Sequence, residues 1–369
     1  MTPSSSPLAD HLYPTILAGG VGSRLWPRSR KSSPKQFLDL TGNGRSMLQE
    51  AFDRMTPLVP PDHVYVITNR EYVDVVRGQL PNVPPENIVG EPAARGSAAA
   101  IGLGAIHLLN RDPHAVMAVL TADHLIRKPD VLRDALMGGA ELAQAGELIT
   151  LGIRPTYPET GYGYIEMGDE LGQFNGLKAR RVRRFREKPD LATAQDFLEA
   201  GNFVWNSGMF IWRADVIMSQ FARFMPKLHA ALTALRPALH GAEEDAAFNR
   251  FWMPLQGNVT IDYGVMEKAE RAAVFPVDLG WHDIGSWAAL LEILPKDDDG
   301  NVIQARHLHH ESSNVLVFSQ DRLIATIGLQ DMIIVDTGDA VLVMPADRAQ
   351  EVKKIIQALK DNGLEAYLD

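Results

Sequence analysis

The stretch TILAGGVGSRLWPRSRKSSPKQF, residues 15–37, decides how the chain begins to fold. An apolar run ends in a cluster of three glycines, Gly19, Gly20 and Gly22, and basic residues without any acid follow. Glycines directly after a buried strand let backbone N–H groups approach a phosphate closely. The spacing matches neither a Walker loop nor a dinucleotide-binding turn. We therefore expect a different glycine-rich turn that holds a small anion.

The basic residues after the turn fit such a ligand. Arg24 and Lys35 are suited to neutralise the outer phosphates of a triphosphate. For Arg28, Arg30 and Lys31 two roles stay open: they steer the triphosphate, or they face water. A positively charged surface loop without a ligand is the alternative for the whole stretch.

Apolar runs alternate with amphipathic runs as far as residue 153. Strands are expected at 13–20, 63–69, 87–92, 115–124 and 147–153, and helices at 46–55, 71–80, 97–110 and 129–145. This alternation predicts right-handed crossovers and a parallel sheet covered on both faces. Ligands bind at the carboxyl ends of such strands, and polar clusters stand there at 19–24, 91–97 and 123–124.

The rhythm changes after residue 160. Strand-like runs at 161–168, 178–189 and 203–212 and a helical stretch at 214–271 predict an insertion, about 160–270, that joins the same sheet and covers the substrate. After a turn-rich linker at 296–301, short runs at 314–319, 323–328, 332–338 and 340–345 predict a small β unit, followed by a helix at 347–363. We expect a catalytic domain at 1–294 and a small C-terminal unit at 295–369.

Composition narrows the classes of function. The 369 residues carry a formal net charge of −10, which disfavours nonspecific nucleic-acid binding. The chain has no cysteine, which excludes disulfides, thiolate zinc sites and cysteine nucleophiles and fits a reducing compartment. No apolar run reaches the roughly 18 residues of a transmembrane helix. Residues 1–11 are expected to be a flexible lead-in rather than a signal peptide.

Two aspartates are candidates for a metal site. Asp123 ends the strand in TADH, and Asp283 lies between tryptophans in GWHDIGSW. Mg²⁺ takes one or two carboxylates together with phosphate oxygens, so the pair suits a metal beside a triphosphate. For either aspartate taken alone, helix capping is the favoured interpretation. The histidines, including His107, His114 and the HLHH run, match no zinc spacing.

The predicted insertion holds candidate sugar contacts. In FREKP, the Glu187 carboxylate can accept bonds from sugar hydroxyls while Lys188 meets a phosphate. The nearby arginines at 180–184 are expected to be a partly solvated face. Gly163 and Asn206, beside aromatic residues, suit a flat sugar ring, although hairpin turns explain these glycine-rich stretches equally well.

Together these stretches resemble the sugar-nucleotide pyrophosphorylases, and most specifically the mannose-1-phosphate guanylyltransferases. The matching pieces run in family order over residues 13–290: LAGGVGSRLWPRSR, PKQF, EPAARGSAAAIGLGA, TADH, GIRPTYPETGYGYIE, FREKPD, WNSGMFIW, DYGVMEK and GWHDIGSW. The resemblance implies a Rossmann-like, glycosyltransferase-A-like α/β fold, a mixed sheet flanked by helices, with a β-helix-like C-terminal unit. It implies a short form without the isomerase domain, and hence no isomerase activity.

The reaction implied by the resemblance joins GTP and mannose 1-phosphate to give GDP-mannose and pyrophosphate, with Mg²⁺ as cofactor. Catalysis is implied for Arg24, Lys35, Asp123, Lys188 and Asp283, and metal binding for Asp123 and Asp283. Nucleotide contacts are implied for Leu17, Ala18, Gly19, Gly20, Gly22, Ser23, Arg24, Glu91, Ser97 and Asp123. Mannose 1-phosphate contacts are implied for Gly163, Glu187, Lys188, Asn206 and Asp262. We further expect a cytoplasmic homodimer without nucleic-acid or membrane partners.

One stretch departs from the family pattern. This chain has RGSAAA at 95–100 where the family usually reads RNTAPA, so the details of the nucleotide contact, and with them the base selectivity, stay open. A pyrophosphorylase for ADP-glucose, dTDP-glucose or a GDP-heptose is the nearest alternative. A catalytically silent relative that binds a nucleotide sugar is the alternative from a different class, although the charged positions are all present.

Overall fold

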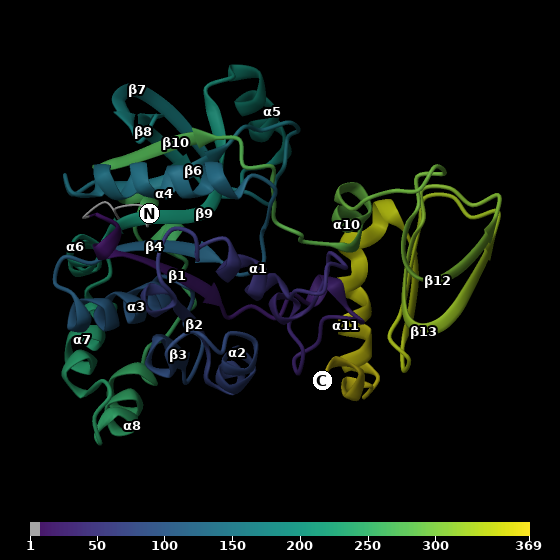
Figure 1. Cartoon of the computed structure of the whole chain (residues 1–369), viewed down its shortest axis with the longest axis horizontal. Coiled ribbons are helices and arrows are strands. Elements are labelled where there is room, and N and C mark those ends of the chain that lie inside the picture. Colours follow the sequence, from purple (N-terminus) through teal and green to yellow (C-terminus); the bar gives the residue numbers. More distant parts are fainter. Residues whose placement is uncertain (1–7) are drawn as a thin grey trace, which may run out of the picture. The chain divides into compact units, whose positions relative to one another are not determined.

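The computed structural model describes residues 8–369, so most of the lead-in predicted for 1–11 lies outside the described residues. Two compact units make up the chain (Figure 1). The first unit comprises 8–19, 51–122 and 126–281, and the second comprises 20–50, 123–125 and 282–369. This division follows contacts in space, and the domain boundary at 294–295 stays a prediction from the sequence.

The first unit is built on one nine-stranded sheet with the order β3-β2-β1-β4-β9-β6-β10-β8-β7. Its strands are β1 (Leu12–Ala18), β2 (Tyr65–Asn69), β3 (Ile88–Glu91), β4 (Val116–Thr121), β6 (Leu148–Ile153), β7 (Tyr164–Phe174), β8 (Leu177–Arg186), β9 (Phe203–Arg213) and β10 (Ala272–Val277). Strands β1 to β4 pair in parallel, as their alternation with helices predicts. Strand β9 runs antiparallel between β4 and β6, so the predicted α/β fold with a mixed sheet is confirmed.

The helices that contact this sheet are α2 (Val73–Gln79), α3 (Ser97–Arg111), α4 (Pro129–Ala143), α5 (Leu191–Ala200) and α6 (Ala214–Phe224). Helices α7 (Pro226–Leu235), α8 (Glu244–Ala247) and α9 (Ile261–Gly264) pack on neighbouring helices, and α1 (Met47–Asp53) has residues in both units. Helix α3 contacts β1, β2 and β4, and α4 contacts β6 and β9 (Figure 1). Small residues let α3 approach its neighbours, since a side chain at Gly102 would collide with Leu232. No described helix is long and apolar enough to cross a membrane.

The second unit contains a four-stranded sheet and two helices. Its elements are β12 (Val302–His310), β13 (Leu316–Ile327), β14 (Met332–Asp336), β15 (Val341–Pro345), α10 (Trp287–Ile293) and α11 (Val352–Asp361). The two runs predicted at 314–319 and 323–328 are one strand, β13. Trp26 and Trp287 share one buried apolar core with Phe318 on β13, so this core joins the glycine-turn segment to the C-terminal sheet. The short strands β5 (Leu125–Ile126) and β11 (Trp281–His282) complete the fold.

Candidate functional site

The glycine turn of the second unit is shaped around Lys35. Gly22 has a left-handed backbone with φ of 71°, and a Cβ there would lie 2.5 Å from the Lys35 side chain. The backbone N–H of Lys35 donates to the Val21 carbonyl at 3.3 Å, and the Ser29 hydroxyl donates to the same oxygen. Only glycine allows this close approach, so Gly22 fixes the path of Lys35.

Lys35 lies at the centre of a charged cluster. Its ammonium is 2.7 Å from Asp123 Oδ2 and donates to the Asp283 and Ile284 carbonyls at 3.4 and 3.3 Å. Burial is the largest single influence on Asp123 and opposes its ionisation. The charges of Lys35 and His124, together with hydrogen bonds to the carboxylate, outweigh burial, so the pKa of Asp123 is lowered. A Cβ on Gly285 would lie 2.9 Å from Asp283 Oδ2 and 3.1 Å from the Arg24 guanidinium.

Four of the five predicted catalytic residues therefore gather in the second unit: Arg24, Lys35, Asp123 and Asp283. Lys188 lies in the first unit. Gly20, Gly22 and Ser23 belong to the second unit, and the other predicted nucleotide contacts, apart from Arg24 and Asp123, belong to the first.

Carbonyl groups at the end of β1 are held by neighbouring strands. Ala122 N–H donates to the Leu17 carbonyl at 3.1 Å, and the Thr68 hydroxyl donates to the Ala18 carbonyl at 2.8 Å. The Asn69 amide donates to the Gly19 carbonyl at 3.4 Å. These bonds fix the strand end from which the glycine turn departs.

Glu91 ends β3 directly opposite Asn69 on β2. Burial raises the pKa of Glu91 to about 7, against a smaller lowering by the Arg95 backbone N–H. Glu91 Oε2 and Asn69 Oδ1 are both buried, and neither has a hydrogen-bond partner among the described residues. Two orphaned acceptors on paired strand ends require donors from elsewhere, since leaving them buried without partners is costly. Asn69 was not among the predicted site residues, although it ends the strand VITN as Glu91 ends its own strand.

Ser97 begins helix α3 and connects it to α9. The Ser97 hydroxyl accepts a bond from the Ile261 N–H at 3.0 Å. The Ala98 N–H donates to the Val259 carbonyl at 3.2 Å, and a Cβ on Gly96, where φ is 91°, would collide with the Val259 backbone. The start of α3 is thus hydrogen-bonded to the start of α9, the helix that carries the predicted sugar contact Asp262.

The five predicted mannose 1-phosphate residues lie together in the first unit. The Asn206 amide donates to Asp262 Oδ1 at 2.9 Å, and the Asn206 N–H donates to the Gly163 carbonyl at 2.8 Å. Lys188 Nζ lies 3.2 Å from Glu187 Oε1, and Gly163 faces Glu187 Oε2 so closely that a Cβ would collide with it. That oxygen is buried and has no partner among the described residues.

Charge repulsion adds to burial in this cluster. Burial raises the pKa of Glu187, and the nearby Asp262 carboxylate raises it further, against a lowering by Lys188. Burial also raises the pKa of Asp262. Such carboxyls gain stability when ligand hydroxyls donate to them, which suits a polyhydroxylated substrate.

Aromatic rings flank the same cluster. The Trp205 ring lies 5.0 Å from Tyr157 and 5.3 Å from Tyr162, and Tyr162 lies 5.2 Å from Trp281. Trp205 and Tyr162 are direct chain neighbours of Asn206 and Gly163. Aromatic residues were expected beside Gly163 and Asn206, but the pairing of Tyr162 with Trp281 was not, because the two are more than a hundred residues apart in sequence.

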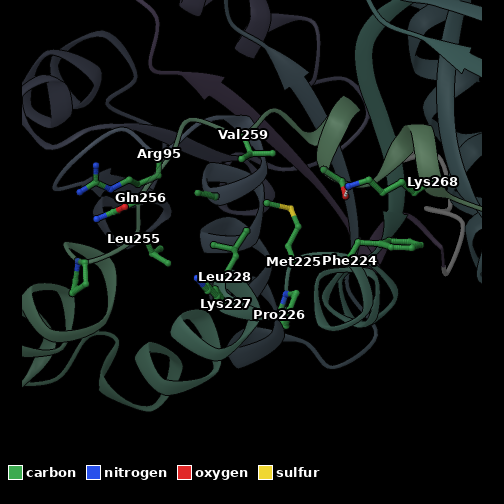
Figure 2. Close-up of a pocket in the computed structure, with 13 residues that line it drawn as sticks. Arg95, Phe224, Met225, Pro226, Lys227, Leu228, Leu255, Gln256, Val259 and Lys268 are labelled. Carbon is green, nitrogen blue, oxygen red and sulfur yellow. Dashed lines mark hydrogen bonds between the residues drawn. The ribbon is translucent and has the colours of Figure 1, made fainter.

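A cavity of about 740 Å³ lies beside helix α3 (Figure 2). None of the predicted site residues lines it. Its lining includes Arg95, two residues before Ser97 in the sequence, and Val259 and Gly264, which precede and follow Asp262 in the sequence. The apolar side chains of Met225, Leu228 and Leu255 form much of its wall. The cavity therefore borders the segments that carry the predicted contacts without containing them.

The carboxylates of Asp123 and Asp283 are the candidate ligands for a metal ion. Over residues 8–369, no three His, Asp or Glu side chains form a group able to hold a metal ion. Asp123 and Asp283 supply hard carboxylate oxygens in the same unit, and Mg²⁺ binds through one or two carboxylates plus substrate phosphates. These two carboxylates therefore fit a divalent cation that also takes phosphate oxygens as ligands.

Comparison with known proteins gives two family matches. Residues 13–300 match the nucleotidyl transferase family, and residues 305–359 match the MannoseP isomerase/GMP-like beta-helix domain. A mannose-1-phosphate guanylyltransferase of Klebsiella pneumoniae is 42% identical over 359 residues, covering 96% of this chain and 75% of that protein. One of Escherichia coli is 41% identical over the same shares.

A solved structure is similar throughout. A Thermus thermophilus protein described as a mannose-1-phosphate geranyltransferase has a TM-score of 0.84 and 34% identity, covering 95% of this chain and 99% of that one. These matches confirm the resemblance seen in the sequence motifs. The chain belongs to the nucleotidyl transferase family and, within it, to the mannose-1-phosphate guanylyltransferases.

Proposed function

We propose that the chain joins GTP and mannose 1-phosphate into GDP-mannose and pyrophosphate. The observation that carries this proposal is the match to mannose-1-phosphate guanylyltransferases along 96% of the chain. The intact charged cluster around Lys35 supports an active enzyme rather than a silent relative.

In the proposed reaction, a phosphate oxygen of mannose 1-phosphate attacks the α-phosphorus of GTP in line. The new bond joins that oxygen to the α-phosphorus, and the bond from the α-phosphorus to the bridging oxygen breaks, so that pyrophosphate leaves. The attacking oxygen is already anionic near neutral pH, so no general base is required. Positioning and charge neutralisation then supply the catalysis.

The second unit would neutralise the triphosphate. Arg24 and Lys35 would stabilise charge on the departing pyrophosphate, and backbone groups of Gly20 and Gly22 would approach the phosphates. Asp123 and Asp283 would hold Mg²⁺, which supplies charge neutralisation when bound with the nucleotide. Lys35 contacts Asp123 directly, so it would orient that carboxylate as well.

The first unit would bind the base and the sugar. Glu91 and Asn69 provide buried acceptors that match the N1–H and N2–H donors of guanine, and adenine lacks this pair of donors. Glu187, Asn206 and Asp262 would accept and donate bonds to mannose hydroxyls, while Lys188 would hold the sugar phosphate. Ser97 would act near the base through the start of α3.

We also propose a cytoplasmic homodimer. The outer halves of β12 and β13 form a two-stranded ribbon whose exposed side chains include Leu308, Leu323 and Ile327, the last 76% exposed. A ribbon of two strands with exposed apolar side chains gains stability by packing against a second copy. Sedimentation velocity of Ile327→Lys tests this: we expect a monomer where the unaltered chain is a dimer, and an unchanged dimer would refute this surface.

The activity is tested with a panel of nucleoside triphosphates against several sugar 1-phosphates, read by pyrophosphate release. We expect GTP with mannose 1-phosphate to give the highest kcat/KM. Because RGSAAA departs from the family pattern, the panel includes ATP, dTTP, glucose 1-phosphate and a heptose 1-phosphate. Preference for another pair would replace the proposed substrates, and release of no pyrophosphate with any pair would favour a binding protein.

A further inference from the structure

Three bases of the glycine-turn segment have no part in the proposed chemistry, and the structure shows what Arg30 does. Its guanidinium donates to both carboxylate oxygens of Asp339, at 2.6 and 2.7 Å, and to the Thr337 hydroxyl at 3.2 Å. These partners lie in the turn between β14 and β15. The Arg30 hydrogen bonds lower the pKa of Asp339 to about 2, so the pair is charged throughout the physiological range.

Arg28 also packs against the C-terminal sheet. Its guanidinium carbon lies 4.0 Å from the centre of the Phe318 ring on β13. Burial lowers the pKa of Arg28 to about 10, and the nearby Asp39 opposes that shift. Arg28 and Arg30 therefore pack against the C-terminal sheet rather than face water.

The last residues of the chain hold the same segment from another side. The Trp26 indole N–H donates to the Tyr367 carbonyl at 2.8 Å, and the Lys31 backbone N–H donates to the Leu368 carbonyl at 3.0 Å. Gln350, just before α11, accepts a bond from Arg24 itself at 3.2 Å. Contacts from β13, the β14–β15 turn and the residues on either side of α11 thus converge on residues 24–31.

This segment needs external support. Residues 26–34 form no α-helix or strand, and they follow a turn that contains Gly20 and Gly22. Each ordered residue loses conformational entropy, so an irregular segment keeps one conformation only where contacts fix it. A cation that stabilises a leaving group is effective only when it is held in place before the reaction.

We propose that the C-terminal β unit is a positioning element for Arg24, with Arg30 and Asp339 as its main tie. The inference rests on the proposed function, because it assigns Arg24 to the departing pyrophosphate. Arg30 and Asp339 touch no substrate in this account; they act through the path of the segment between Arg24 and Lys35. Removing the Arg30–Asp339 pair should therefore raise the KM for pyrophosphate and leave the sugar contacts of the first unit intact.

The test compares Asp339→Asn with a matched control. Asp215→Asn breaks a similar two-bond pair, Arg213–Asp215, at 2.9 and 2.5 Å, and Asp215 is about as exposed as Asp339 (44% against 48%). In pyrophosphorolysis of GDP-mannose, we expect Asp339→Asn to raise the KM for pyrophosphate about tenfold, since misplacing a group by about 1 Å can cost up to 100-fold. The KM for mannose 1-phosphate in the forward direction should change less than about twofold, and Asp339→Glu should recover part of the loss.

A second readout does not depend on activity. Amide hydrogen exchange of residues 22–31 should be faster in Asp339→Asn than in the unaltered chain, and unchanged in Asp215→Asn. Unchanged exchange in this segment, or a loss that affects both substrates equally with a lower melting temperature, would overturn the positioning role. If the unaltered chain makes no GDP-mannose, the proposed function fails, while the exchange result still decides whether Asp339 orders the segment.

Discussion

Replacing Glu91 by glutamine should remove a pH dependence that is built into the first unit. Glu91 is only 5% exposed, and burial raises its pKa to about 7 from the usual 4.5. That difference, at about 1.4 kcal/mol per pH unit, corresponds to about 3 kcal/mol. Between these two pH values the folded chain binds more protons than the unfolded chain. Stability therefore falls as pH rises from 4.5 to 7, by up to about 3 kcal/mol. The Glu91→Gln chain should lack this fall.

Ligand binding should show the opposite slope. If the Glu91 carboxylate accepts guanine N–H groups, only the ionised form binds well, and about nine in ten Glu91 side chains are protonated at pH 6 when the pKa is about 7. GDP-mannose should therefore bind about tenfold more weakly at pH 6 than at pH 8. The product is a suitable probe because its diphosphate does not titrate in this range.

The measurements are urea unfolding between pH 4.5 and pH 8 and isothermal titration of GDP-mannose at pH 6, 7 and 8. The Glu91→Gln chain should bind more weakly at pH 8 and with little dependence on pH. Equal pH slopes in the two chains, for both stability and binding, would refute the assignment of Glu91 to the base.

Three further substitutions test the other proposed roles. Lys188→Ala should raise the KM for mannose 1-phosphate far more than the KM for GTP in steady-state kinetics, and equal effects would exclude the phosphate contact. Asp283→Asn should lower magnesium-dependent turnover about 100-fold or more while circular dichroism stays unchanged, so near-normal activity would make Asp283 structural. Lys35→Met should raise the pKa of Asp123 and lower the free energy of unfolding in urea by about 2 kcal/mol. This is less than the ~3–5 kcal/mol lost when a fully buried pair is broken, because Asp123 is 31% exposed. The same substitution should lower kcat about 100-fold, and unchanged stability and kcat would dismiss the central role of Lys35.

Local sequence signals predicted much of the fold. The alternation of apolar and amphipathic runs located strands β1 to β4 and β6, because each strand is buried on both faces and reads as a short apolar run. Strand β12 was missed because its polar run, QARHLHH, shows no clear alternation and is largely exposed. Helix α5 was not singled out, although Asp190 caps it by accepting the Thr193 N–H at 2.8 Å.

The candidate site divides in the same way. The glycine turn with Gly22 and the nearby Lys35 could be singled out because a strand end followed by glycine and base is a local pattern, and their roles with a ligand stay predictions. The ion pair of Arg30 with Asp339 could not be predicted, since the two residues are 309 positions apart and charge alone does not show which acid a base will contact. Asn69 carries a weak local signal, a polar residue that ends a strand, but its orphaned oxygen is visible only once β2 and β3 are paired.

The most direct test of the central claim is exchange of labelled pyrophosphate into GTP. If mannose 1-phosphate attacks the α-phosphorus itself, the label should enter GTP only when mannose 1-phosphate is present, because GDP-mannose must form and be cleaved again. Label entering GTP without the sugar phosphate would show a guanylyl–enzyme intermediate and contradict direct transfer. No label entering GTP in the presence of mannose 1-phosphate would contradict the proposed activity itself.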